Sequence, residues 1–327
     1  MESIKTRTIR WGIVGLGKIA EKFATDLLTV KDAELYAVAS RDQEKANKFA
    51  SKYNAQKAFG RYQDLSNDER VDAVYIATPH VFHKENSMMF LKKGIAVLCE
   101  KPLGINHEEV TEMIDCAQAN NVLLMEALWT YFLPHYQYVL TLLKENHFGK
   151  IVKLEADFGF NPDYDESSRL MNKSLGGGSL LDIGIYPIFA ALSTLGLPKK
   201  MDATATYFNT DVDSSCAMVF HYPNQVTAHL KSTLIEKTPT QAIFYCEKGT
   251  IRINTMFHQP STVTLISEGT EKTIDFDYNT IGYNFETEHF NQLLKQGKTQ
   301  SNIMTFSFSK KLVKLLDQVR NTIELAY

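Results

Sequence analysis

Residues 72–83 read Asp-Ala-Val-Tyr-Ile-Ala-Thr-Pro-His-Val-Phe-His, and residues 95–102 read Ile-Ala-Val-Leu-Cys-Glu-Lys-Pro. The apolar runs 73–77 and 95–99 have the length and β-branched content of buried parallel strands. The segment between them is long enough for a crossover helix. Lys101 therefore follows the carboxyl end of a strand, and Pro102 biases its backbone toward an extended conformation. Because open α/β sheets bind ligands at that edge, Lys101 is a candidate functional residue, the alternative being a solvated surface lysine.

A glycine-rich loop lies near the start of the chain, between a strand expected at 9–14 and a helix ending near residue 28. It reads Gly15-Leu16-Gly17-Lys18-Ile19-Ala20, the dinucleotide-binding pattern with alanine in the third glycine position. Gly15 permits a tight turn, and Gly17 lets the backbone approach a pyrophosphate at the start of the helix. A second strand at 34–39 favours nucleotide binding over the alternative, a tight packing turn.

The end of the second strand distinguishes between the two nicotinamide cofactors. Ser40 and Arg41 occupy this position. Hydroxyl and guanidinium donors suit the 2′-phosphate of NADP, whereas NAD usually meets a carboxylate there. NADP is therefore the expected cofactor, and NAD is the alternative if Asp42 binds the ribose hydroxyls. Thr78 and Pro79, at the end of the next core strand, leave room for the nicotinamide ribose.

Two histidines and a group of aromatic residues each allow two interpretations. His80 and His83 are three residues apart, but no third ligand lies nearby, so we expect for each a helix cap or a hydrogen bond on the substrate side, and no metal site. Trp129 and Tyr131 either line a sugar or diol pocket or belong to the core, because aromatic rings serve both purposes. Phe132 is expected in the core.

Composition excludes several classes of protein. The 327 residues suggest two domains, and 44% hydrophobic and 22% charged residues are ordinary for a globular enzyme. A net charge of -3 argues against a nucleic-acid partner. No apolar run approaches the ~20 residues of a membrane span and no signal-peptide stretch is evident, so we expect no membrane partner and a cytoplasmic location. The four cysteines lack CxxC spacing, which predicts buried thiols.

The hydrophobic period changes after Gly149. Apolar and polar residues alternate over 152–160 and 226–231, as in a sheet covered on one face. The remaining expected strands are 57–59, 122–125, 203–208, 216–221, 242–246, 251–254 and 263–267, and the expected helices are 43–53, 107–120, 285–295 and 306–325. The sequence predicts an α/β protein with two domains. Residues 1–125 would form a doubly wound parallel sheet, and residues 126–327 a large open, mostly antiparallel sheet, with the last helix able to pack back on the first domain.

The stretch Gly176-Gly177-Gly178-Ser179-Leu180-Leu181-Asp182-Ile183-Gly184-Ile185-Tyr186-Pro187 is a second candidate cluster. Ser179 is expected to cap a helix that runs to about residue 195, with a kink at Pro187. Asp182 and Tyr186 are four residues apart, so they project from one helical face and can reach one ligand together. The alternative is an ordinary surface hydrogen bond.

Taken together, the glycine loop, the Glu100-Lys101-Pro102 triplet and the Asp182-x-Gly184-x-Tyr186 pattern resemble the Gfo/Idh/MocA oxidoreductases. The stretch from Gly176 is most similar to the branch of dimeric dihydrodiol and NADP-dependent xylose dehydrogenases. The resemblance covers nearly the whole chain and implies a Rossmann domain followed by an α/β domain used for dimerisation. Related enzymes of this branch often have arginine where this chain has Tyr131, so the identity of the substrate does not carry over.

The resemblance implies roles for individual residues. Lys101 would be the active-site lysine, Tyr186 the acid/base group and Asp182 the carboxylate one turn earlier. The expected cofactor site comprises Gly15, Leu16, Gly17, Lys18, Ile19, Ser40, Arg41, Thr78, Pro79, His83, Glu100 and Lys101, and the expected substrate site comprises Lys101, Trp129, Tyr131, Asp182 and Tyr186.

The expected reaction is hydride transfer between NADP and a CH–OH carbon of a sugar or cyclic diol. The alternatives are a nucleotide-binding regulator of the same fold and an NAD-assisted glycoside hydrolase. A homodimer or larger homo-oligomer is expected, because a sheet covered on one side leaves apolar and aromatic area on the other.

Overall fold

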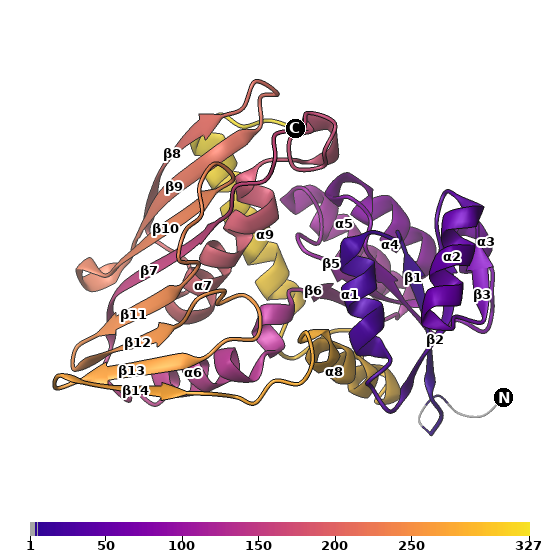
Figure 1. Cartoon of the computed structure of the whole chain (residues 1–327), viewed down its shortest axis with the longest axis horizontal. Helices are drawn as coiled ribbons and strands as arrows, with labels where there is room; N and C mark the ends of the chain where they lie inside the picture. Colours follow the sequence, from indigo (N-terminus) through magenta and orange to yellow (C-terminus); the bar gives the residue numbers. More distant parts are fainter. Residues whose placement is uncertain (1–3, 5) are drawn as a thin grey trace. The chain divides into compact units, whose positions relative to one another are not determined.

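The structure is a computed structural model that describes residue 4 and residues 6–327 (Figure 1). The chain divides into two compact units, Met1–Trp129 with Asn279–Lys310, and Thr130–Tyr278 with Lys311–Tyr327. The first boundary between the units lies after residue 129, and the boundary expected from the sequence lies after residue 125. Residues 279–310, which the sequence analysis assigned to the second domain, belong to the first unit.

The first unit contains a six-stranded parallel sheet with the order β3-β2-β1-β4-β5-β6. Its strands are β1 Ile9–Val14, β2 Ala33–Ala39, β3 Lys57–Phe59, β4 Ala73–Ile76, β5 Ala96–Glu100 and β6 Leu124–Ala127. Because β1 pairs with both β2 and β4, the chain reverses its winding direction there and places helices on both faces. The expected doubly wound parallel sheet is confirmed.

The helices of the first unit are α1 Lys18–Leu27, α2 Gln43–Tyr53, α3 Tyr62–Ser66, α4 His83–Leu91, α5 His107–Asn120 and α8 Tyr283–Lys295. In α1, Ala20, Phe23 and Leu27 recur at helical spacing and are fully buried, so one apolar face packs inward. Helix α1 packs on α8, and α4 packs on α5 (Figure 1).

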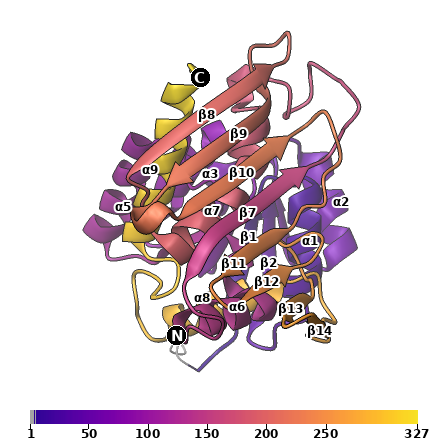
Figure 2. The ribbon, with the colours of Figure 1, turned by 90° about the vertical axis from the view of Figure 1, so that its left-hand side faces the viewer.

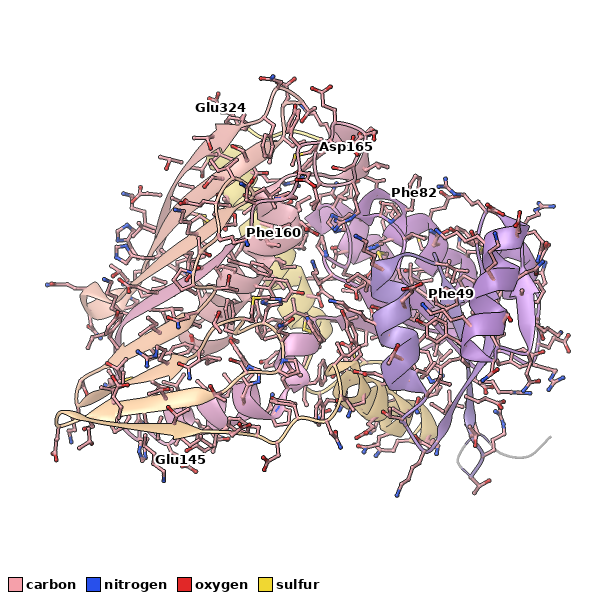
Figure 3. All side chains as sticks on the ribbon, in the orientation of Figure 1. Phe49, Phe82, Glu145, Phe160, Asp165 and Glu324 are labelled. Atoms are coloured by element: carbon pink, nitrogen blue, oxygen red, sulfur yellow. The ribbon has the colours of Figure 1, made fainter. Side chains whose placement is uncertain are left out.

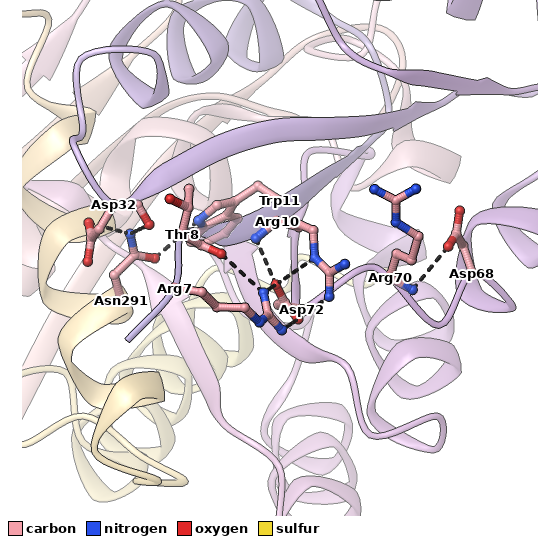
Figure 4. A network of polar contacts seen from close by, with 9 residues as sticks. All are labelled: Arg7, Thr8, Arg10, Trp11, Asp32, Asp68, Arg70, Asp72 and Asn291. Carbon is pink, nitrogen blue, oxygen red and sulfur yellow. Dashed lines mark hydrogen bonds and ion pairs between the residues drawn. The ribbon is translucent and has the colours of Figure 1, made fainter. Parts of the chain in front are cut away.

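Buried polar contacts attach α8 to the first unit. The Asp26 carboxylate, 1% exposed, accepts bonds of 3.1, 2.7 and 2.8 Å from the backbone N–H groups of residues 281–283. The Trp11 indole donates to Asn291 over 3.1 Å, and Asn291 donates to Asp32 over 3.0 Å (Figure 4). Hydrogen bonds to a buried carboxylate are stronger than neutral ones, so these contacts make α8 an integral part of this unit.

The second unit contains an eight-stranded sheet with the order β14-β13-β12-β11-β7-β10-β9-β8. Its strands are β7 Ile151–Gly159, β8 Lys200–Tyr207, β9 Asp213–His221, β10 Thr227–Thr233, β11 Ala242–Cys246, β12 Gly249–Ile253, β13 Val263–Ser267 and β14 Thr270–Ile274. Only β7 and β10 pair in parallel among these strands, so the expected mostly antiparallel sheet is confirmed. Strand β14 was not among the predicted strands, and it is charged and largely exposed, as edge strands often are.

Helices cover one face of this sheet. They are α6 Pro134–Lys144, which contacts β12, α7 Ile185–Leu195, which contacts β7 and β10, and α9 Phe306–Thr322, which begins in the first unit and continues into the second. Figure 2 views the sheet from its opposite face. Along β10, Ala228 and Leu230 are buried whereas His229 is exposed, which is the alternation expected of a sheet covered on one side.

The opposite face of the sheet is more charged than the sequence analysis expected. It contains a shallow hollow of about 510 Å³, whose lining includes Glu155, Asp157, Asp202, His229 and Lys231. Several of these side chains are paired, for example Asp202 with His221 over 2.8 Å. The expected apolar and aromatic area is therefore interrupted by ion pairs of both signs.

Within the described part of the chain, the segment Lys173–Leu195 alone has the length and apolar composition of a membrane-crossing helix. Of its tested window, 94% is buried inside the fold, as in the core helix of many proteins that do not cross membranes.

Candidate active site

The glycine loop after β1 leaves its backbone open to a ligand. Gly15 has a φ of +87°, and a Cβ atom there would lie 2.9 Å from the carbonyl oxygen of Ala77, so the position requires glycine. A Cβ atom on Gly17 would meet no described atom within 4 Å. Lys18 and Ile19 are exposed, whereas the Leu16 side chain is buried. No side chain within the described residues caps the first turn of α1, so its N-terminus suits a phosphate.

The tip of β2 presents a cation and a hydroxyl. Arg41 is exposed, and its guanidinium carbon lies 5.9 Å from the ring centre of Phe82, which is labelled in Figure 3. The Asp42 carboxylate accepts bonds of 2.9 and 3.2 Å from the N–H groups of Glu44 and Lys45 and so caps α2. The Ser40 hydroxyl oxygen accepts the Asp42 N–H over 3.2 Å. Asp42 is thus already bonded, whereas Arg41 extends toward solvent.

The ends of β4 and β5 are linked through His83. Its Nε2 atom lies 2.9 Å from the Thr78 carbonyl oxygen, and its Nδ1 atom lies 2.8 Å from the Pro102 carbonyl oxygen. His83 is fully buried, and its side chain holds the two loops in place. It therefore does not face a cofactor, where the sequence analysis had placed it. Asn86 donates to the Thr78 hydroxyl over 3.2 Å, and Pro79 next to it is half-buried.

Two buried carboxyl groups hold the backbone around Lys101, which is half-buried. Glu100 accepts a hydrogen bond from the Tyr75 hydroxyl and another, of 3.1 Å, from the Lys101 backbone N–H. Burial, and then the charge of Glu100, raises the pKa of Tyr75, so its phenol stays protonated and donates. Glu126 accepts the Leu103 N–H over 2.9 Å. The Glu100 side chain therefore orients the loop, whereas the sequence analysis placed it at the cofactor.

A third buried acid, Glu286 of α8, lies near Glu100. Burial, and then the charge of Glu100, raises the pKa of Glu286 well above its usual range, so this carboxyl is neutral. Neither of its oxygens has a hydrogen-bond partner within the described residues. Helical spacing could have placed this residue inward, because Tyr283 three residues before it and Phe290 four residues after it are buried. Glutamate is seldom fully buried, so the residue type pointed the other way.

Asp182 and Tyr186 lie in the second unit, on a segment that starts as a π-helical turn, Leu180–Gly184, and continues as α7. Single π-turns often occur at functional sites. The change of winding lies directly before Pro187, which has no N–H to bond a carbonyl of the preceding turn, so it occurs where regular α-helical bonding would be interrupted. Ser179 was expected to cap the helix, but its hydroxyl donates a hydrogen bond to Asp213 and makes no capping bond.

The two candidate side chains of this segment have different neighbours. Asp182, 6% exposed, pairs with Arg169 at 2.8 Å. The ring of Tyr186, 5% exposed, lies 5.0 Å from that of His258, measured between ring centres, and His258 stacks on Phe158 at 4.1 Å.

Arg169 and His258 are residues that the sequence analysis missed. Arg169 lies in a loop 13 residues before Asp182, and His258 lies in a loop well after Tyr186 in the chain. No local motif marks either residue. The loop that carries Arg169 follows Phe160 and passes Asp165, both labelled in Figure 3.

The aromatic residues divide between core and surface. Trp129 is 5% exposed and stacks on Tyr283 at 4.3 Å within the first unit, and Phe132 is buried as expected. Tyr131, in the second unit, is half-buried and lies 5.1 Å from Phe189. Trp129 is therefore a core residue, whereas part of the Tyr131 side chain is accessible to solvent.

The structure thus gathers the candidates into two groups. Adjacent strand ends of the first unit bring together the glycine loop, Thr78 and Lys101, since β1, β4 and β5 are neighbours in the sheet. One short segment of the second unit carries both Asp182 and Tyr186. No set of three or more histidine, cysteine or acidic residues suited to a metal ion occurs among residues 4 and 6–327.

Two family descriptions match the sequence. Residues 9–128 match an oxidoreductase family with an NAD-binding Rossmann fold, and residues 136–252 match the GFO/IDH/MocA C-terminal domain. Trans-1,2-dihydrobenzene-1,2-diol dehydrogenase of Xenopus tropicalis is 34% identical over 97% of this chain and 99% of its own. The Homo sapiens enzyme of the same name is 32% identical over 98% of both chains.

Solved structures show the same fold. A 3-ketoreductase from Actinomadura kijaniata, in complex with NADP and TDP-benzene, superposes with a TM-score of 0.89 at 26% identity and covers 97% of this chain and 98% of its own. An aldose-aldose oxidoreductase from Caulobacter crescentus, complexed with glycerol, also has a TM-score of 0.89, at 21% identity and with the same coverage, and this likeness concerns the fold alone.

Proposed function

Because this chain belongs to the Gfo/Idh/MocA oxidoreductase family, we propose that it is an NADP-dependent dehydrogenase of a sugar or cyclic diol. One observation carries the proposal. The glycine loop and Lys101 occupy the carboxyl ends of β1 and β5, on either side of β4 in the same sheet, where α/β sheets bind ligands.

The surroundings of Arg41 support NADP over NAD. NAD binding at this strand end usually depends on a carboxylate for the ribose hydroxyls. The nearest carboxylate in sequence, Asp42, instead accepts two backbone N–H bonds at the start of α2. The Arg41 guanidinium favours a phosphate, and the Ser40 hydroxyl can still donate a hydrogen bond to it. The alternative that Asp42 binds the ribose would require it to leave its capping position.

The names of the relatives support the substrate class. The matching enzymes from frog and human are named for a trans-dihydrodiol, and the Actinomadura relative is a 3-ketoreductase that binds NADP. Vicinal diols and pyranose sugars share a secondary alcohol beside further hydroxyl groups. We infer a small cyclic substrate of that kind, with hydride transfer at its CH–OH carbon.

The proposed chemistry divides between three side chains of this chain. Bound NADP would accept or supply the hydride at its nicotinamide ring. Lys101 donates a hydrogen bond to the reacting substrate oxygen, and its charge favours the ionised form of a phenol acting on the same oxygen. Tyr186 takes the hydroxyl proton during oxidation and returns it during reduction. Asp182, fixed by Arg169, orients the substrate at Tyr186.

We further propose a homodimer and a cytoplasmic location. The uncovered sheet face carries charged groups of both signs, which can pair across a two-fold axis with the same groups of a second copy. All four cysteines are free thiols, as in most proteins of reducing compartments.

A substrate screen tests the proposal. Purified protein is assayed with NADP against aldoses, inositols and cyclic diols, including trans-1,2-dihydrobenzene-1,2-diol, by the absorbance of reduced nicotinamide. The Lys101→Met variant is the control, because it leaves the glycine loop intact. Net NADPH formation that requires Lys101 is the expected result. Cofactor binding without turnover would instead indicate a regulator, and glycoside cleavage without net reduction would indicate a hydrolase.

A further inference from the structure

A buried carboxylate that the proposed chemistry does not use contacts the segment bearing Asp182 and Tyr186. Asp213, the first residue of β9, is fully buried. Its Oδ2 atom accepts hydrogen bonds of 2.6 Å from the Ser179 hydroxyl and 2.7 Å from the Leu180 backbone N–H. Both donors lie where the π-turn begins, so Asp213 fixes the first residues of this segment.

Glycines at both ends of the π-turn let its backbone lie close to β9 and β10. Gly178 has a φ of +106°, and a Cβ atom there would collide with Oδ1 of Asp213. At the other end of the π-turn, a Cβ atom on Gly184 would lie 2.9 Å from the Ser232 hydroxyl. The Ser232 hydroxyl also lies 2.9 Å from that of Ser179. The π-turn is thus held between the start of β9 and the end of β10.

We propose that Asp213 is a positioning residue of the active site, whose negative charge fixes the π-turn and thereby places Asp182 and Tyr186. The assignment of a role in turnover depends on the function proposed above. Bonds from N–H and O–H donors to a carboxylate are stronger than those to a neutral acceptor. Small displacements of catalytic groups can cost a large factor in rate, so loosening this turn should lower turnover.

The charge of Asp213 changes near neutral pH. Burial raises the pKa of this carboxyl to about 7. As the pH falls through that value, the carboxylate takes up a proton and its two hydrogen bonds weaken. The titratable groups that face it are Tyr207 of β8, Cys216 of β9 and Tyr327. Burial, and then the charge of Asp213, raises the pKa of all three, so they stay neutral across this range.

Tyr327 adds a second contact to the same segment. Its hydroxyl donates to the carbonyl oxygen of Gly177, one residue before Gly178. Its ring lies 5.4 Å from the guanidinium carbon of Arg320, the charged group that faces it from α9. The neutral phenol makes this contact at any pH near 7, so it does not account for a change of activity there.

The test compares Asp213→Asn with Asp211→Asn. Asp211 is exposed two residues earlier, and its φ of +58° suits asparagine equally well. We expect Asp213→Asn to lower kcat about tenfold while the KM for NADP stays unchanged. In the direction of reduction, where Tyr186 acts as a neutral phenol, wild-type kcat should decline below about pH 7, and this decline should be absent in Asp213→Asn because asparagine does not titrate. Asp211→Asn should match the wild type in all three respects.

Hydrogen–deuterium exchange supplies a readout that needs no substrate. Exchange in a peptide covering residues 179–186, corrected for the intrinsic effect of pH, should speed up in the wild type as the pH falls through about 7. In Asp213→Asn it should be fast at every pH. Exchange that stays at wild-type level in this variant would overturn the proposal, even if no substrate is found. If exchange behaves as expected but the substrate screen gives no turnover, the proposed function alone fails.

A second variant covers the case in which Asp213→Asn does not fold. Ser179→Ala removes one of the two donors and keeps the charge of Asp213. This variant should lower kcat by a smaller factor, about threefold, and its kcat should still decline below about pH 7. Hydrogen–deuterium exchange over residues 179–186 should become faster than in the wild type. Wild-type kcat together with wild-type exchange in Ser179→Ala would also overturn the proposal.

Discussion

Replacing Arg41 by alanine should lower the proposed preference for NADP over NAD about tenfold. The guanidinium is the exposed cation at the tip of β2, oriented over the Phe82 ring at 5.9 Å. A charge-assisted hydrogen bond to a phosphate contributes roughly 1.5–3 kcal/mol, and solvent around an exposed guanidinium favours the lower value. About 1.5 kcal/mol corresponds to roughly a tenfold rise in the KM for NADP. NAD lacks the 2′-phosphate, so its KM should change less than about twofold.

The assay measures initial rates with both cofactors at a saturating concentration of one substrate. Lys92→Ala is the matched control, because it also removes one positive charge but lies after α4, before β5 begins, at the opposite edge of the sheet. Raising the ionic strength should narrow the difference between wild type and Arg41→Ala, since salt screens an exposed charge. An unchanged ratio of the two Michaelis constants in Arg41→Ala would refute the assignment. An equal change in Lys92→Ala would show that net charge, and not position, governs cofactor choice.

Three further predictions concern catalysis, stability and assembly. Tyr186→Phe keeps the ring beside His258 but removes the hydroxyl that carries the proton, so turnover should fall by a factor of about 10²–10⁴. NADP binding, measured by fluorescence, should persist. Near-normal turnover in this variant would assign the proton transfer to Lys101. Glu126→Gln should flatten the pH dependence of stability in urea unfolding. Burial raises the pKa of this carboxyl from 4.5 to about 7, so the wild type loses up to about 3 kcal/mol as the pH rises through that window, and equal slopes for both proteins would contradict this. Ala217→Arg, on β9 in the hollow of the uncovered sheet face, should halve the mass measured by light scattering. Thr270→Arg on the edge strand β14 should leave the mass unchanged, and a wild-type mass near 37.1 kDa would rule out the dimer.

Local sequence patterns predicted the elements whose residues are buried together. The strand at 9–14 and the helix at 43–53 have the predicted limits, because apolar runs and helical spacing report burial directly. The glycine loop and Lys101 were found for a related reason. Each follows a core strand, and the strand order then places them at neighbouring positions along one edge.

Contacts between distant residues could not be predicted in this way. Nothing near Asp26 indicates that its carboxylate accepts three N–H groups from residues 281–283. Ser179 has the residue type of a helix cap, but its hydroxyl donates a hydrogen bond to Asp213, which lies 34 residues later at the start of β9. In each case the partner comes from a different element, so spacing along the chain carries no signal.

The assignment of residues 279–310 to the first unit affects the order in which the protein can assemble during synthesis. Ribosomes produce chains from the N-terminus, and domains usually fold as they emerge. Here the parallel sheet is complete once residue 127 has been made, but the indole of Trp11 and the carboxylate of Asp26 lack their partners until α8 appears. The whole eight-stranded sheet, through residue 274, is synthesised in between. The nascent nucleotide-binding unit therefore stays unfinished while most of its neighbour is translated, and a fragment ending at Trp129 should expose the surface that α8 covers.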